Sequence, residues 1–352
     1  MKIDDKTSHN SPSIRLPEFT GEWEKCKIED ITDAVSSGKS KNHFSNGEYN
    51  LYGSTGIIGR TDKALYDGKL VLVARVGANA GFLQIINEPC GITDNTLILK
   101  PKGIDAFYLY YFLQHFNLNR LIFGSGQPLI TGGMLKKVKV SLGTISEQSK
   151  IVKFLSLLDE RIATQVRLID RLQSLMIGIA QKIAHSNKPN VRISDCLECS
   201  SSALQESEVN KTGKYPVYGA NGIVGYIDKY HTQNEAIYII KDGSGVGGVS
   251  YVTGKCSSTG TLNILQAKNG HSLKYLYYLL KVFNFVPYKT GMAIPHIYFK
   301  DYGKAKIFCP AYPEQLEYAK LLSSIDGNLR IALDSLKNFN LQKQYLLRHM
   351  LI

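Results

Sequence analysis

Apolar residues recur every three or four positions along a proline-free stretch from Ser146 to about Ala184. This spacing is typical of one face of a long amphipathic or coiled-coil helix. We expect Ser146 to cap the helix and Glu147 to favour its N-terminus. About 38 residues at ~1.5 Å each give a rod of roughly 57 Å. The predicted seam residues are Ile151, Leu155, Leu158, Ile162, Val166, Ile169, Leu172, Met176, Ile179 and Ile183.

The same pattern returns from about Glu314 to the C-terminus, and Pro313 stands where a helix starts well. A long helix with one apolar stripe must bury that stripe, and the equivalent helix of the same chain is the obvious partner. We therefore predict that the two helices pair antiparallel. The second seam comprises Leu322, Ile325, Leu329, Leu333, Leu336, Phe339, Leu346 and Met350.

The segments before each long helix read as short strands separated by glycine turns. Residues 70–74 and 237–240 are apolar, rich in β-branched side chains and bounded by glycines, which favours buried strands. Helices are expected at Phe107–Phe116 and Leu273–Phe283, with aromatic stripes that serve core packing.

The chain is an internal repeat. Tyr52-Gly53-Ser54-Thr55-Gly56-Ile57-Ile58-Gly59 matches Tyr218-Gly219-Ala220-Asn221-Gly222-Ile223-Val224-Gly225 at an offset of 218 − 52 = 166. Further blocks keep an offset of 166 or 167: Arg75 to Gly81 against Lys241 to Gly247, Glu147-Gln148 against Glu314-Gln315, and Asp159 against Asp326. The molecule is therefore two tandem copies of one unit, with a polar boundary at 185–190.

Composition agrees with a globular protein of about two domains. The 352 residues include 42 Lys and Arg against 30 Asp and Glu, a net charge of +12. Such an excess suggests a polyanionic partner, most often nucleic acid, although a basic enzyme with scattered lysines is the alternative. The first residues lack an apolar signal-peptide region, apolar runs are too short for a membrane span, and the six cysteines suggest a reducing cytoplasm.

Catalytic and metal motifs are weak. Gly243-Ser244-Gly245-Val246-Gly247-Gly248 fits a dinucleotide loop formally, but a strand-like segment follows instead of a helix. Gly38-Lys39-Ser40 lacks the leading glycine of a phosphate loop. Cys196 and Cys199 form a lone C-x-x-C, and Cys26, Cys90, Cys256 and Cys309 offer no second pair, so we expect no metal site. These absences favour a binding protein over an enzyme.

These blocks together resemble the specificity (S) subunits of Type I restriction-modification systems (HsdS). The opening from Arg15 to Glu24, the paired Tyr-Gly-x-x-Gly-Ile-x-Gly segments, the basic residue before a glycine turn and the Glu-Gln helix openings carry the resemblance. It implies an α+β chain with two tandem α/β target recognition domains separated by two long antiparallel coiled-coil spacer helices. The implied division is recognition domain 1 at 1–145, the central spacer helix at 146–188, recognition domain 2 at 189–312 and the C-terminal spacer helix at 313–352.

The resemblance also implies a chain without an active site or cofactor of its own. Its partners would be double-stranded DNA, two modification subunits that bring S-adenosylmethionine and methylate adenine, and restriction subunits that bring ATP- and Mg-dependent translocation and cleavage. Two alternatives stay open: an orphan DNA-binding or anti-restriction module of the same architecture, and an unrecognised basic hydrolase.

Loops carry specificity on rigid scaffolds, so we expect polar and basic residues of the repeated loops to contact DNA. Arg75 and Lys241 are the leading pair, because both suit guanine or phosphate and precede a glycine turn. Local capping, core packing or turn formation could instead explain each residue. The predicted set is Tyr52, Ser54, Arg60, Arg75, Asn79 and Gln127 in the first copy, and Tyr218, Asn221, Lys241, Ser244 and His296 in the second.

The outward faces of the long helices are the expected contact surface for the modification subunits. A solvated charged face is the alternative interpretation. The candidate residues are Arg161, Arg167, Arg171, Arg330 and Lys337.

Overall fold

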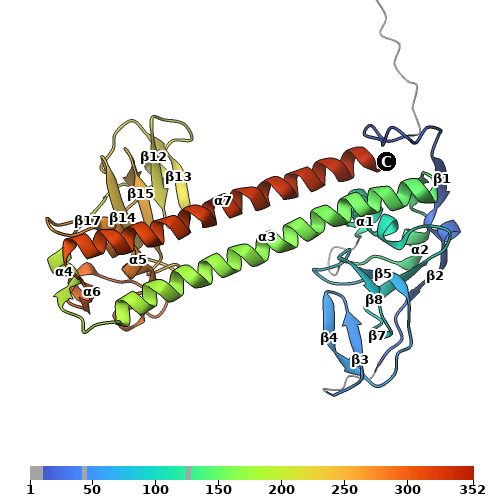
Figure 1. The fold of residues 1–352 in the computed structure, drawn as a ribbon, viewed down its shortest axis with the longest axis horizontal. Helices are drawn as coiled ribbons and strands as arrows, with labels where there is room; N and C mark the ends of the chain where they lie inside the picture. The colour runs from blue at the N-terminus through green and yellow to red at the C-terminus, as the bar shows by residue number, and fades with distance from the viewer. Residues whose placement is uncertain (1–10, 42–45, 124–127) are drawn as a thin grey trace, which may run out of the picture. The chain divides into compact units, whose positions relative to one another are not determined.

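The structure is a computed structural model that describes residues 11–41, 46–123 and 128–352, and its internal contacts divide the chain into two units. Unit 1 comprises Met1–Gln165 and Ser335–Ile352, and unit 2 comprises Val166–Asp334. Each of the two long helices, α3 and α7 in Figure 1, therefore contributes one part to each unit.

Unit 1 contains a module of short strands in three sheets. The strand orders are β2-β8-β5-β6, β4-β3-β7 and β1-β9. The strands span Glu24–Lys27 (β1), Thr32–Ser37 (β2), Tyr49–Gly53 (β3), Gly56–Thr61 (β4), Lys69–Ala74 (β5), Leu83–Asn87 (β6), Cys90–Ile92 (β7), Thr96–Pro101 (β8) and Lys139–Leu142 (β9).

Unit 2 repeats this arrangement strand for strand. Its orders are β11-β17-β14-β15, β13-β12-β16 and β10-β18. The strands span Val191–Arg192 (β10), Leu197–Ser201 (β11), Tyr215–Gly219 (β12), Gly222–Ile227 (β13), Glu235–Ile240 (β14), Val249–Thr253 (β15), Ser257–Ser258 (β16), Leu262–Ala267 (β17) and Lys306–Ile307 (β18).

The two modules also share strand register. Val71 pairs with Leu99 in unit 1, and Ile237 pairs with Leu265 in unit 2. Both hairpins, β3-β4 and β12-β13, carry a register shift at the same place, before Tyr52 and before Tyr218. The predicted internal repeat and the predicted strands at 70–74 and 237–240 are confirmed.

Each module contains one helix of about three turns, α1 (Ala106–Phe116) and α5 (Leu273–Val282), close to the predicted bounds. Asp105 caps α1 and Ser272 caps α5 through side-chain oxygens that accept backbone N–H groups, as expected of these residue types. Tyr108 and Tyr275 are fully buried, so the aromatic stripe is core. The shorter helices are η1 (Ile28–Ile31), η2 (Leu118–Leu121), α2 (Gly132–Lys136), α4 (Ile193–Cys196), η3 (Glu206–Glu208), η4 (Val286–Tyr288) and α6 (Phe299–Tyr302).

The long helices are α3 (Ile145–His185) and α7 (Tyr312–Met350), which confirms their prediction. The expected cap at Ser146 is wrong, because α3 already begins at Ile145. Thr144 takes that role instead, and its Oγ1 accepts the Glu147 amide at 3.3 Å. A hydroxyl one residue before the first helical residue is the one placed to accept an N–H of the first turn.

Within each unit the two long helices share a core. In unit 1, Ile151 and Leu155 of α3 belong to the same buried cluster as Leu347 and Met350 of α7. In unit 2, Met176 and Ala180 of α3 line a common hollow with Leu329 of α7 and with α5. The start of α3 thus meets the end of α7 and the end of α3 meets the first half of α7, so the pairing is antiparallel.

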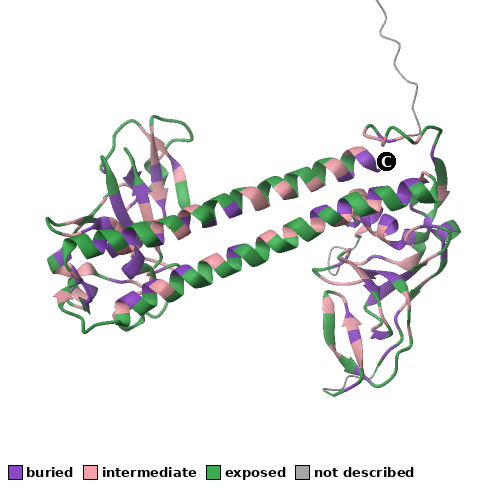
Figure 2. Cartoon of the chain, viewed as in Figure 1, coloured by how far each residue is buried: buried purple, intermediate pink, exposed green. Residues whose placement is uncertain are grey.

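The predicted seams are buried or half-buried except at two positions. Val166 is 41% exposed and Leu333 is 45% exposed, so their assignment to the buried seam is wrong. Both lie within about one turn of the boundary between the two units, where Ile169 and Ala332 take the buried positions instead. Figure 2 shows buried and exposed positions alternating along both helices.

None of the helices in the described part of the chain combines the length and apolar character that a bilayer crossing requires.

Candidate nucleic-acid interface

Arg75 and Lys241 occupy equivalent backbone positions at the ends of β5 and β14. The Arg75 amide donates to the Asn95 carbonyl at 2.9 Å, and the Arg75 carbonyl accepts from Ile130 at 2.9 Å. The Lys241 amide likewise donates to the Thr261 carbonyl at 3.0 Å, and its carbonyl accepts from Ile297 at 2.9 Å. Backbone hydrogen bonds on both sides fix where each basic side chain begins.

A glycine turn follows each basic residue. Gly77 and Gly243 have φ of 80° and 94°, and Gly81 and Gly247 have φ of 88° and 91°. A side chain at these positions would be strained in this left-handed region, so the turn requires glycine. This confirms the equivalence of the two glycine segments, although their sequences differ.

The β-hairpin turn lies next to the glycine turn in each unit. In unit 1 the Tyr52 carbonyl accepts from Thr93 at 3.0 Å, and Ser54 Oγ donates to the Asn95 carbonyl at 3.3 Å. The Asn95 carbonyl also accepts the Arg75 amide, so one atom joins the two turns. In unit 2 the Tyr218 carbonyl accepts from Thr259 at 2.8 Å.

A third loop joins each cluster. Gly77 donates to the Pro128 carbonyl and Gly243 to the Pro295 carbonyl, both at 3.0 Å. We call residues 53–56, 75–82, 93–95 and 128–130 turn cluster 1, and residues 219–222, 241–248, 259–261 and 290–297 turn cluster 2. Gln127, one of the predicted site residues, lies outside the described residues.

In turn cluster 1 the predicted side chains differ in how they are held. Arg75 is half-buried, its guanidinium lies 3.4 Å from Ser37 Oγ, and its buried Nε has no hydrogen-bond partner within the described residues. Asn79 is exposed on the glycine turn. These two side chains have donor capacity available for a ligand.

Tyr52 and Arg60 lie beside turn cluster 1 and bond to the protein itself. Tyr52 Oη donates to Glu88 Oε1 at 2.5 Å, and burial together with this bond raises the pKa of the Tyr52 phenol. Hydrogen bonds from Asn50 and Tyr52 lower the pKa of Glu88. Arg60 is exposed and donates to the Glu48 carbonyl at 3.2 Å.

Turn cluster 2 gathers acidic and basic groups. Lys241 Nζ lies 3.6 Å from Asp242 Oδ2, and His296 Nδ1 lies 2.7 Å from Asp242 Oδ1. Ser244 is exposed beside them. The fold therefore brings Lys241, Ser244 and His296 together, and adds Asp242, which the sequence interpretation did not single out.

Tyr218 and Asn221 lie on the hairpin of unit 2. Tyr218 is half-buried with its ring centroid 5.8 Å from that of Tyr238, and burial raises the pKa of its phenol. Asn221 is exposed in the turn. The tyrosine therefore has a packing role, whereas the asparagine is accessible.

Sequence reasoning missed Lys39 and Lys41. They line a hollow of about 690 Å³ together with Asp94 and Asn95, next to the hairpin side chain of Ile58. The signal in the sequence is the pair of lysines in Gly38-Lys39-Ser40-Lys41, a segment whose first three residues resemble only the end of a phosphate loop.

The basic residues expected at a partner interface lie on the long helices and are exposed. Arg330 is held by Asp326, with Nη2 at 2.9 Å from Oδ2. Arg161 borders a hollow of about 490 Å³ in unit 1 that is lined mainly by apolar side chains. The other basic residues predicted to contact a partner, Arg167, Arg171 and Lys337, are exposed as well.

Exposed apolar side chains accompany these cations, and sequence reasoning missed them. Where such side chains form a contiguous patch, they mark a protein-protein contact surface. On α3 they include Phe154, Leu157, Leu168, Leu175 and Ile177, and on α7 they include Leu316, Leu321, Ile331, Leu341 and Tyr345.

Comparison with known proteins gives a consistent result. The family model described as "Type I restriction modification DNA specificity domain" matches twice, at residues 20–174 and 186–338. A putative type I restriction enzyme specificity subunit of Haemophilus influenzae is 25% identical over 123 residues, 34% of this chain and 32% of the relative. The EcoprrI specificity subunit of Escherichia coli is 26% identical over 127 residues, 36% of this chain and 31% of the relative. The matched segments thus span about a third of each curated relative.

Solved structures support the fold. The S subunit of a Type I system from M. genitalium superposes with a TM-score of 0.73 at 19% identity, covering 97% of this chain and 99% of that chain. A chain from a structural study of Type I complex assembly and conformational transition gives a TM-score of 0.54 at 13% identity, covering 95% and 98%.

Two tandem modules of one topology, two long antiparallel helices and a double family match agree with one another. The chain belongs to the Type I restriction modification DNA specificity domain family.

Proposed function

We propose that this chain is the DNA-recognition subunit of a Type I restriction-modification complex and reads a bipartite, asymmetric duplex site, one half with each unit. The observation that carries the proposal is that both units present the same turn cluster on the same backbone with different side chains. Arg75 and Val76 of cluster 1 correspond to Lys241 and Asp242 of cluster 2. Two backbones of the same shape that present different side chains are suited to the recognition of two different DNA half-sites.

Each cluster combines chemistry that base recognition needs. Arginine and lysine donate to O6 and N7 of guanine in the major groove, and a carboxylate such as that of Asp242 accepts from the amino group of cytosine. Lys39 and Lys41, in the hollow beside cluster 1, suit backbone phosphates. Phosphate contacts position the protein, and base contacts supply the specificity.

The long helices are the proposed platform for the partner subunits. Their exposed apolar side chains and cations offer the mixed surface that protein-protein interfaces use. In this account two modification subunits bind there and bring S-adenosylmethionine, and restriction subunits bring the ATP- and Mg-dependent reactions. The chain itself then contributes recognition without catalysis, and the complex acts where the cellular DNA lies, in the cytoplasm.

A selection experiment tests the recognition. The full-length chain would be incubated with random-sequence duplexes, and the bound fraction sequenced over several rounds. The proposal expects enrichment of two short unrelated half-sites at a fixed separation, together with no methylation or cleavage when the purified chain receives S-adenosylmethionine, ATP and Mg²⁺. Enrichment of a single uninterrupted site, or methyl transfer by the chain alone, would contradict it.

A further inference from the structure

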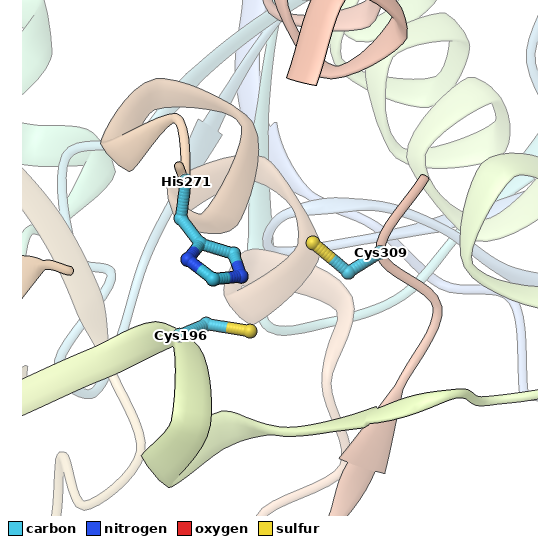
Figure 3. A group of neighbouring side chains, drawn as sticks. All are labelled: Cys196, His271 and Cys309. Carbon is cyan, nitrogen blue, oxygen red and sulfur yellow. The ribbon is translucent and has the colours of Figure 1, made fainter. Parts of the chain in front are cut away.

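Three potential metal ligands meet at one corner of unit 2. They are Cys196 at the end of α4, His271 just before α5, and Cys309 just before α7. Their ligand atoms all lie within 4.8 Å of one another. Figure 3 shows one imidazole nitrogen and both sulfur atoms facing a common space. The cluster belongs to neither turn cluster, and the proposed DNA recognition does not use it.

Backbone hydrogen bonds hold the three ligands in place. The Cys196 carbonyl accepts from Lys268 at 2.9 Å, and the Lys268 carbonyl accepts from the His271 amide at 3.1 Å. The side chain of Asn190 makes two hydrogen bonds to the backbone of Cys309. Its Nδ2 donates to the Cys309 carbonyl at 2.8 Å, and its Oδ1 accepts from the Cys309 amide at 2.8 Å. Three segments that are far apart in sequence are thus fixed around one point before any ligand binds.

The three equivalent positions of unit 1 carry aliphatic side chains. The Ile31 carbonyl accepts from Lys102 as the Cys196 carbonyl accepts from Lys268, so Ile31 corresponds to Cys196. Ile104 precedes the cap of α1 as His271 precedes the cap of α5. Tyr108 and Tyr275 donate to the carbonyls just before Leu142 and Cys309 respectively.

Ile31 and Ile104 are buried in the unit 1 core, and Leu142 packs against that core. The fold therefore does not require polar atoms at this corner. Unit 2 carries two sulfur atoms and an imidazole where unit 1 carries three aliphatic side chains, and this difference is specific to one copy of the repeat.

The donor set matches a soft or borderline divalent cation. Thiolate and imidazole are the ligands that structural and catalytic zinc sites use, whereas magnesium and calcium prefer oxygen. Two thiolates neutralise the charge of Zn²⁺, so the loaded site would bury no net charge. Both cysteines are buried free thiols, and His271 Nδ1 is buried without a hydrogen-bond partner among the described residues.

The C-x-x-C spacing is not what builds this site. Cys199 lies on β11, and its Sγ contacts the Ser200 carbonyl at 3.7 Å; it is not a member of the cluster. The second sulfur comes instead from Cys309, more than one hundred residues further along the chain. Linear spacing therefore does not predict this cluster, because the fold assembles it from segments that are far apart in the sequence.

We propose that Cys196, His271 and Cys309 bind one zinc ion, with water in the fourth position, and that this ion ties the end of α4 to the starts of α5 and α7. Binding replaces the thiol protons of both cysteines, which leave to solvent. The ion would join the recognition module of unit 2 to the helix that follows it, the task that aliphatic packing performs in unit 1.

Metal content and cobalt spectroscopy test the proposal on the full-length chain, purified under reducing conditions without chelator. We expect about one zinc per chain by mass spectrometry of the metal, since the three ligands define a single site. After removal of the zinc, Co²⁺ should produce sulfur-to-cobalt charge-transfer absorption that saturates at the same ratio. Cys309→Ser should weaken Co²⁺ binding more than roughly 100-fold, because loss of a ligand should exceed the loss of an outer-shell partner.

Two controls separate metal binding from folding. Cys199→Ser removes the neighbouring thiol and should leave zinc content and cobalt absorption unchanged. The triple variant Cys196→Ile, His271→Ile and Cys309→Leu copies unit 1 and should fold, by circular dichroism, without binding Co²⁺. Three outcomes would overturn the proposal: a reduced wild-type chain that binds neither metal, a folded triple variant that binds Co²⁺ as well as the wild type, or a Cys196–Cys309 disulfide in the reduced preparation.

Discussion

The side-chain oxygen of Gln148, at the start of α3, accepts a hydrogen bond of 3.1 Å from the backbone amide of Asp105, the residue that caps α1. Gln148 Nε2 donates in turn to the Gly143 carbonyl at 2.9 Å. Unit 2 repeats both bonds, with Gln315 accepting from Ser272 at 2.8 Å and donating to Pro310 at 2.9 Å. One buried glutamine therefore joins each recognition module to the long helix that follows it.

Replacement of either glutamine by leucine should destabilise its unit. Gln148→Leu leaves the part-buried Asp105 amide and Gly143 carbonyl without this partner, at the lower end of the about 1–3 kcal/mol that each buried unsatisfied group costs. Urea unfolding should show a midpoint shifted to lower denaturant for Gln148→Leu and Gln315→Leu. Gln344→Leu, at an exposed position of α7, serves as the matched control and should shift little. Equal midpoints for all three variants would refute the role of the buried pair.

Arg75→Ala and Lys241→Ala should each relax base preference in one half-site only. Loss of a good contact to a base edge costs about 1–3 kcal/mol of discrimination. Competition binding with duplexes mutated in either half would measure this, with Arg75→Lys as the conservative control. Relaxation of both halves by a single substitution would contradict the assignment of one half-site to each unit.

Lys39→Ala and Lys41→Ala should weaken binding to all duplexes alike. If each lysine neutralises one phosphate, the slope of log affinity against log salt should fall by about 0.9 per substitution. Titrations at several salt concentrations would give the slope. A changed base preference with an unchanged slope would mean that these lysines read bases instead.

Tyr52→Phe should destabilise unit 1 in a pH-dependent way. The Tyr52 hydroxyl helps to lower the pKa of Glu88 below its ordinary value of 4.5. A depressed folded-state pKa contributes stability above the unfolded-state pKa, and this contribution disappears as the pH falls through the folded-state pKa. The stability difference between wild type and Tyr52→Phe should therefore be largest at neutral pH and shrink below about pH 4.5. A difference that is constant from pH 7 to 3 would exclude the Glu88 link.

Periodic features of the fold were predictable from the sequence. The steps of three and four along α3 and α7 and the constant offset between the glycine segments predicted two units and two long helices. These features are local or repeated, so the residues of one segment are enough to predict its secondary structure. The predicted burial of Val166 and Leu333 was wrong because the side chains of α3 and α7 that face a partner depend on the neighbouring elements, and the nearby Ile169 and Ala332 are buried instead.

The details of the sites were less predictable because they depend on long-range contacts. Asp242 and His296 meet across 54 residues, and Gln148 reaches Asp105 across 43. Cys196, His271 and Cys309 come together only once β18, α4 and α5 have folded. The residue type at one position does not indicate which distant residue its side chain will contact.

The measurement that tests the central claim most directly is a map of methylated adenines in the host genome, with and without an intact copy of this gene. The account predicts that disruption of the gene abolishes methylation at one bipartite, asymmetric motif and leaves other motifs unchanged. A methylation map that is identical in both strains, despite expression of the chain alongside its modification subunits, would contradict it.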